Sequence, residues 1–166
     1  MSNRVLKFEN CEFENIFDKE FNTATLHFFG DIDREFPIEL PLQANLSKIN
    51  LYLKNLRLLN SAGIKNFILL MEFFNKKRIK VSFHECPPSF ILQCSSVMEM
   101  VTPQRVVKSL FLPYINEENN EEILILQNAS DLNLENFSDE RNHEGTELSF
   151  NHNPKLFLNF LTYQNK

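Results

Sequence analysis

Residues 49–93 read INLYLKNLRLLNSAGIKNFILLMEFFNKKRIKVSFHECPPSFILQ, and this run decides the fold expected of the chain. An apolar run at residues 49–53 is typical of a strand, and a turn at residues 59–63 follows it. A helical pattern then extends from about residue 62 to 77, and a second strand-like run covers residues 79–83. Strand, turn, helix and strand at this spacing predict a crossover unit, with two parallel strands in one sheet and the helix on its face.

The predicted helix is apolar on more than one face. Five residues follow the i, i+3, i+4, i+7 spacing and are expected to face the sheet: Ile64, Phe67, Ile68, Met71 and Phe74. Three further apolar residues lie off that stripe: Leu69, Leu70 and Phe73. Either another segment of the chain covers these three, or they form a surface for a partner or the seam of a homodimer.

The segment before this unit predicts a hairpin. Residues 5–13 alternate loosely and favour an edge strand, residues 23–29 favour a second strand, and residues 15–22 are expected to turn between them. Two prolines argue against a long helix in residues 34–47, although a short turn of helix at residues 42–46 is expected.

The C-terminal part predicts short elements around a polar, acidic turn at residues 116–122. A short helix is expected at residues 89–94, with Pro88 in its first turn. The expected strands cover residues 106–112, 123–126 and 147–150. Residues 154–163 predict a final helix that begins with Pro154.

Composition limits the classes of function. The 166 residues include 17 Phe, enough for one packed domain or one domain with a small appendage. A net charge of −5 argues against a nucleic-acid partner, which needs a basic surface. With 3 Gly the chain has neither a G-x-G-x-x-G motif nor a Walker lysine loop, so it lacks the usual cradle for nucleotide phosphates.

The cysteines and the N-terminus predict a cytoplasmic protein. The three cysteines are odd in number and form no C-x-x-C pair, which favours reduced thiols. The first residues do not form a signal peptide, and no apolar run has the length of a membrane helix, so no membrane partner is expected. Asp31 and Asp33 follow a predicted strand and are interpreted as solvated turn formers.

The order of these blocks resembles the STAS fold, the domain of anti-sigma-factor antagonists and of sulfate-transporter tails. Residues 30–33 (GDID) are similar to the family's G-E-L-D at the end of the second strand. Residues 53–63 resemble D-L-x-x-x-x-x-x-D-S-S-G, the strand and phosphorylation loop, and residues 77–81 resemble the start of the next strand. The resemblance implies that residues 1–112 form a bacterial α/β, STAS-like domain, a mixed β-sheet with helices on one face.

The phosphorylation loop departs from the family pattern. In the antagonists a cognate kinase phosphorylates the serine directly before the glycine, and here that position is Ala62, which has no hydroxyl. The switch is therefore expected to be missing. Ser61 lies one place too early; it is expected to cap the helix, and regulatory phosphorylation of its hydroxyl is the alternative.

Residues 113–166 resemble the tail of a bacterial STAS-like subgroup that carries two zinc knuckles. The four ligand positions of that frame hold Asn116, Asn119, Arg141 and Glu144. None is a cysteine or histidine, which a tetrahedral zinc site requires. The resemblance implies a degenerate zinc-ribbon-like tail, a small β-hairpin/helix appendage without metal or cofactor, held by burial against Phe150 and the C-terminal helix.

These observations predict a non-catalytic regulatory domain rather than an enzyme. Its partner is expected to be a regulatory kinase, an anti-sigma-like protein or another signalling protein. The resemblance implies that the loop before the central helix and the exposed face of that helix bind this partner, through Asn60, Ser61, Ala62, Gly63, Lys65, Asn66 and Leu69. The alternative is a sensing domain that holds an anion or nucleotide at residues 60–63, because a helix N-terminus favours negative charge.

Overall fold

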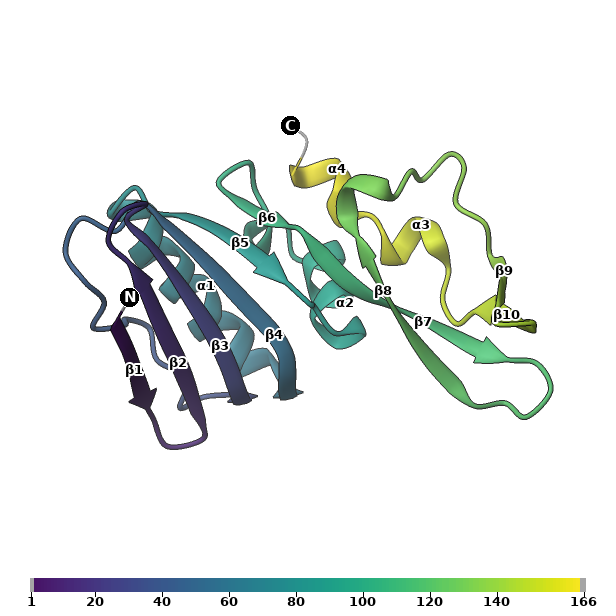
Figure 1. Ribbon diagram of the computed structural model, residues 1–166, viewed down its shortest axis with the longest axis horizontal. Helices are drawn as coiled ribbons and strands as arrows, with labels where there is room; N and C mark the ends of the chain where they lie inside the picture. Colours follow the sequence, from purple (N-terminus) through teal and green to yellow (C-terminus); the bar gives the residue numbers. More distant parts are fainter. Residues whose placement is uncertain (1, 165–166) are drawn as a thin grey trace.

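The computed structural model describes residues 2–164, which form a mixed α/β fold with ten strands in two sheets (Figure 1). The first sheet has six strands in chain order: β1 (Ser2–Lys7), β2 (Cys11–Asp18), β3 (Thr23–Ile32), β4 (Lys48–Leu59), β5 (Lys80–His84) and β6 (Arg105–Val107). The strands from β1 to β3 pair antiparallel, and those from β3 to β6 pair parallel. The mixed sheet is confirmed, while its STAS-like character stays a prediction.

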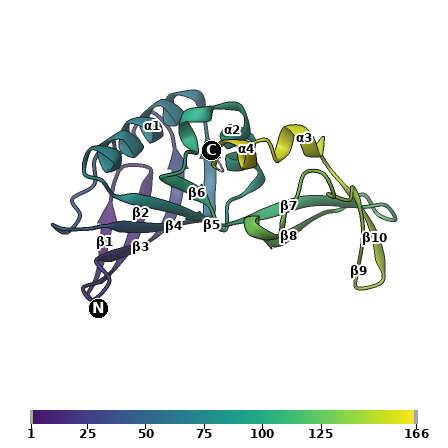
Figure 2. The same cartoon turned by 90° about the horizontal axis from the view of Figure 1, so that it is seen from above.

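The predicted crossover unit is confirmed. Helix α1 (Ser61–Lys76) connects the parallel strands β4 and β5, and α2 (Pro88–Ser96) with a short 3-10 turn (Met98–Met100) connects β5 to β6. Figure 2 shows α1 and α2 on the same side of the sheet, while no described helix covers the opposite side of β2 to β5.

Phenylalanine rings fill the space between helix and sheet. Phe67 of α1 lies 5.9 Å from Phe83 of β5 and 5.4 Å from Phe90 of α2, measured between ring centroids. Phe36 lies 5.9 Å from both Phe28 and Phe67, so it joins the β3 side of the core to the helix. The loop after β3 thus contributes to the core although it has no helix of its own.

The buried face of α1 is rotated about the helix axis relative to the predicted stripe. Leu70 is fully buried, beside Gly63, Phe67, Met71 and Phe74, whereas Ile64 and Ile68 are only half-buried. The suggested homodimer seam of Leu69, Leu70 and Phe73 is therefore wrong in one member, because Leu70 has no exposed surface.

Several predicted boundaries are also wrong. Residues 5–13 are not one strand: a turn at residues 8–10 separates β1 from β2, and β2 continues through much of the expected turn at residues 15–22. Residues 42–46 contain no helix, and β4 extends six residues beyond Leu53 to Leu59. The C-terminal helix is two short ones, α3 (Pro154–Phe157) and α4 (Phe160–Gln164).

The second sheet has the strand order β8-β7-β10-β9. Its strands are β7 (Ser109–Asn116), β8 (Glu122–Asn128), β9 (Glu140–His143) and β10 (Thr146–Phe150), and all its pairs are antiparallel. Only Lys108 separates β6 from β7, so the predicted domain boundary between residues 112 and 113 falls inside β7.

Burial around Phe150 holds the tail together, as the sequence predicts. The Phe150 ring lies 5.4 Å from both Tyr114 and Phe157 and 4.9 Å from Phe137, and in each pair the rings meet edge to face. Ser95, a buried residue of α2, also connects the tail to the first sheet's helices. Its Oγ donates a hydrogen bond to the Phe157 carbonyl at 2.5 Å and accepts one from the Phe160 N–H at 3.2 Å.

Candidate functional site

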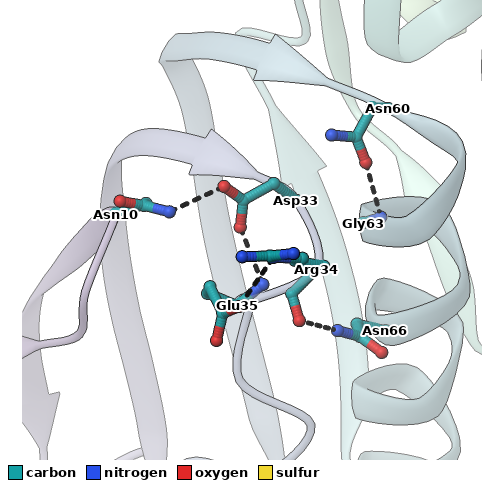
Figure 3. A network of polar contacts seen from close by, with 7 residues as sticks. All are labelled: Asn10, Asp33, Arg34, Glu35, Asn60, Gly63 and Asn66. Atoms are coloured by element: carbon teal, nitrogen blue, oxygen red, sulfur yellow. Dashed lines mark hydrogen bonds and ion pairs between the residues drawn. The ribbon is translucent and has the colours of Figure 1, made fainter.

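The candidate site lies where β3 and β4 end and α1 begins. Parallel strands place their carboxyl ends at one edge of a sheet, and in α/β folds this edge is where binding surfaces usually form. Three chain segments meet there: the β1–β2 turn, the loop after β3 and the start of α1 (Figure 3). Hydrogen bonds fix each of the three to the next.

Asn60 caps α1. Its backbone is extended, with φ −122° and ψ 171°, and its Oδ1 accepts a hydrogen bond from the Gly63 N–H at 2.9 Å. The prediction that Ser61 caps the helix is therefore wrong: Ser61 is the first residue inside α1, and its side chain is exposed. Asparagine and serine are equally good caps, so composition alone does not select between adjacent positions.

Gly63 lets the first turn of α1 touch the end of β3. A β-carbon at this position would overlap the Ile32 carbonyl and stand 2.6 Å from the Asp33 nitrogen. The Asn60 N–H donates to the same Ile32 carbonyl at 3.3 Å. The glycine that the sequence assigns to a partner surface is thus buried, and its role is to permit this close packing.

The loop after β3 is tied to both neighbouring segments. Asn66 Nδ2 donates to the Arg34 carbonyl at 2.8 Å, which links α1 to the loop. Asp33 accepts from Asn10 Nδ2 at 2.7 Å and from the Glu35 N–H at 2.9 Å, which links the loop to the β1–β2 turn. Asp33 therefore does more than form a solvated turn: it connects two segments 23 residues apart.

The predicted partner-binding residues divide into two groups. Asn60, Gly63 and Asn66 build the site, through the cap, the close packing and the loop contact just described. The other four present their side chains to solvent and are free to contact another molecule: Ser61, Ala62, Lys65 and Leu69. We call the exposed stripe Ala62, Lys65, Leu69, Glu72 and Lys76 the outer stripe of α1; its spacing is that of one helix face.

At the start of α1, one backbone N–H group that an anion would use is already hydrogen-bonded within the protein. The Gly63 N–H, which an anion at residues 60–63 would use, donates to the Asn60 side chain. No acidic residue lies in the first turn, so the dipole is not neutralised there. A bound anion would therefore have to displace the Asn60 amide before it gained that hydrogen bond.

A groove of about 560 Å³ opens beside the network, between the β1–β2 turn and the last part of β4. Phe8, Phe29 and Lys54 are among its lining residues, and so is Arg57, whose Nε lies 3.2 Å from the Asp31 carboxylate. Arg57 is largely exposed, so water weakens this ion pair. The groove was not predicted from the sequence because three separate segments form it, and the acidic pair after β3 was the only local signal.

Cys11 lies in the wall of this groove as a protonated thiol. Burial, and then the charges of Asp33 and Asp31, raise the pKa of Cys11 from 9.0 to about 12. A thiol with so high a pKa is a poor nucleophile at neutral pH, because the thiolate is the reactive form. Burial also raises the pKa of Cys86 and of Cys94 well above 9.0.

At two of the four positions that the resemblance compares with zinc ligands, the side chains form turns. Asn116 Oδ1 accepts from the Glu118 N–H at 2.9 Å, and Asn119 Oδ1 accepts from the Glu121 N–H at 2.9 Å. Within residues 2–164 no group of three His, Cys, Asp or Glu side chains is placed to hold a metal ion. Over the same residues, none of the helices is both long enough and apolar enough to pass through a bilayer.

Comparison of this chain with protein-family models, with curated proteins and with solved structures finds no match.

Proposed function

We propose that the chain is a non-catalytic regulatory domain that binds a signalling protein in the bacterial cytoplasm. The contact surface in this proposal is the start of α1 and its outer stripe, with Ser61, Ala62, Lys65 and Leu69 at its centre. The resemblance to anti-sigma-factor antagonists, stated above from residues 30–33 and 53–63, supplies the class of partner: a regulatory kinase, an anti-sigma-like protein or a related signalling protein.

One observation carries the proposal. The exposed residues at the start of α1 stand on a backbone that is fixed by the Asn60 cap, the Gly63 packing and the Asn66 contact with the Arg34 carbonyl. Binding residues on a rigid base lose little conformational entropy when a partner docks. This end of the molecule thus combines exposed side chains with a preorganised backbone.

Because Ala62 precedes Gly63, partner binding at this surface does not depend on a phosphate group at position 62. Ala62 is exposed and has no hydroxyl, so a kinase has nothing to modify there. The exposed groups left for a partner to contact are the methyl group of Ala62, the ammonium group of Lys65 and the apolar side chain of Leu69. We therefore expect the partner to recognise the shape and charge of this surface.

The test is affinity capture with variants that alter this surface and leave its supports intact. We expect Lys65→Glu and Leu69→Ser to lose a partner that the wild-type chain captures, with unchanged circular dichroism. Lys19→Glu, an exposed charge reversal in the β2–β3 turn, serves as the matched control and is expected to retain that partner. Retention of every partner by both α1 variants would remove this surface from the proposal.

A further inference from the structure

Strand β8 forms an edge of the second sheet, and this edge lacks the protective features of the other sheet edges. Strand β8 ends the sheet, and its seven residues, EILILQN, include neither lysine, arginine nor proline. The other sheet ends are protected in the usual ways: β1 carries the exposed Arg4 and Lys7, β9 is short and charged (ERNH), and β6 has only three residues. An unprotected apolar edge strand is a template for pairing with another strand.

The hydrogen bonds at the two ends of the β7–β8 pair show which backbone groups are free. The Asn116 N–H donates to the Glu121 carbonyl, and the Ala129 N–H donates to the Lys108 carbonyl, each at 2.9 Å. Bonded pairs recur at every second residue of an antiparallel ladder. Residues 123, 125 and 127 therefore direct their backbone groups to β7, while residues 122, 124, 126 and 128 direct theirs away from the sheet.

The same alternate residues carry exposed apolar side chains. Leu124 is 47% exposed and Leu126 is 50% exposed, whereas Ile125 between them is 9% exposed. On β7 their cross-strand neighbours are Pro113, opposite Leu124, and the half-buried Phe111, opposite Leu126. This face therefore presents an apolar cluster directly beside the unpaired backbone groups.

We propose that β8 pairs antiparallel with β8 of a second copy of the chain, around a two-fold axis at Ile125. In this register Leu124 lies opposite the partner's Leu126, and Leu126 lies opposite the partner's Leu124. The residues with free backbone groups then face one another across the axis, as a hydrogen-bonded antiparallel pair requires. The two four-stranded sheets become one continuous sheet of eight strands.

Self-complementarity is the reason for a second copy as the partner. Glu122 is the only charged residue of β8, and in this register it faces the partner's neutral Asn128, so no carboxylate opposes another within the paired strands. A shift by two residues toward Glu122 would place that carboxylate opposite the partner's Leu126. The opposite shift would place Leu124 opposite an asparagine, so the leucine-to-leucine register has the best match of side chains.

The first test is mass in solution over a range of concentrations. We expect wild-type protein to approach twice the chain mass of 19.6 kDa, and Leu124→Lys and Leu126→Lys to dimerise at least about tenfold more weakly. Val5→Lys, a change of a 46%-exposed apolar residue on the other edge strand β1, is the control and is expected to dimerise like wild type. A monomer at all concentrations would overturn the proposal.

The second test uses small uncharged substitutions, so that it does not depend on tolerance of a lysine. Leu124→Cys and Leu126→Cys are expected to form an intermolecular disulfide when the two variants are mixed, since directly opposed residues of a bonded pair have Cα atoms about 5.5 Å apart. Each variant alone is expected to cross-link far less. Equal cross-linking of the single variants and of the mixture would contradict this register and overturn the proposal.

Discussion

The carbonyl of Ile32, the last residue of β3, lies directly against the α-carbon side of Gly63, where any other residue would have its β-carbon. This contact brings the first turn of α1 onto the end of β3 and aligns the buried stripe of the helix with the sheet. The position of the outer stripe follows from it, because the two stripes are opposite faces of one helix.

Gly63→Ala is expected to destabilise the fold by about 3 kcal/mol, since the added methyl group meets backbone atoms of β3 that have no room to move. Chemical denaturation measures the change. Ala62→Ser, at the exposed neighbouring position, is the control and is expected to change the free energy of unfolding by less than about 0.5 kcal/mol. A Gly63→Ala protein as stable as wild type would show that the helix start is looser than described.

Asn60→Ala removes the cap of α1, and we expect it to lower the free energy of unfolding by about 1 kcal/mol. Asn60→Asp keeps a capping oxygen and is expected to restore most of the loss. Ser61→Ala is expected to have almost no effect, because the Gly63 N–H donates to Asn60. A larger loss for Ser61→Ala than for Asn60→Ala in the same denaturation experiment would reverse the assignment.

Ser95 connects α2 to the tail, and Ser95→Ala leaves both the Phe157 carbonyl and the Phe160 N–H without this partner. We expect a loss of about 2 kcal/mol, the usual effect of leaving buried polar groups unpaired. Hydrogen exchange should rise first in α3 and α4. Ser96→Ala is the matched control: its hydroxyl bonds only to the Leu92 carbonyl of its own helix and is exposed.

The lowered pKa of His84 predicts that the stability of the fold depends on pH. Burial, and then the charges of Lys48 and Lys108, lower the pKa of His84 below 6.5 in the folded state, so the fold disfavours its protonation. The unfolded chain binds this proton more readily, and stability is therefore full above about pH 6.5 and decreases as the pH falls below it.

His84→Phe keeps an aromatic ring at the position that stacks 4.7 Å from Tyr52 and removes the titrating imidazole. The loss of stability at low pH should therefore become smaller. Denaturation between pH 7 and pH 5 measures it, about the range in which histidine titrates. Lys48→Ala is expected to raise the pKa of His84, measured by NMR titration, because it removes a nearby positive charge. An unchanged pH profile in His84→Phe would assign the effect to other groups.

Cys11 is expected to react with a thiol reagent at least about tenfold more slowly in native than in denatured protein, because its pKa is raised from 9.0 to about 12 and the thiolate is the reactive form. Asp33→Asn removes one of the two carboxylates that raise this pKa and should speed the reaction. The same reagent added to denatured protein gives the full reactivity of all three thiols as the reference. Fast labelling of native protein at neutral pH would contradict the described burial.

The sequence predicted α1 to within one residue at each end. Its signals are local: a helical period of apolar residues and a basic last turn. The orientation of the helix was less predictable. Gly63 lies on the buried stripe and has no apolar side chain to mark that stripe, so the pattern was centred too close to Ile64 and Ile68 and left out Leu70.

The N-terminal hairpin and the C-terminal helix were harder to predict for different reasons. Phe8 and Asn10 continue the alternation of residues 5–13, yet the Phe8 N–H donates to the Cys11 carbonyl and closes a tight turn there. In the tail, the Asn159 side chain donates to the Ser95 carbonyl and interrupts an apolar run that is otherwise suited to one helix. Both features depend on contacts that close only in the folded chain.

The loop and helix at residues 60–69 were predicted in position, but the role of each side chain there was not. The residue types at positions 60–69 indicated a loop and a helix face, and the structure adds which side chains support the backbone and which remain exposed. The groove at Cys11 and the free edge at β8 depend on strand order, which local patterns do not contain.

The short step from β6 to β7 has a mechanical consequence. One nearly continuous extended run is the last strand of the first sheet and an inner strand of the second, with Lys108 as the only residue between. The Cys86 N–H and carbonyl bond to Ser109 and Phe111 and clamp this run just beyond the step. The tail therefore cannot swing on a flexible linker, and a force applied at the β7–β8 hairpin would be transmitted as strain to β5 and β6.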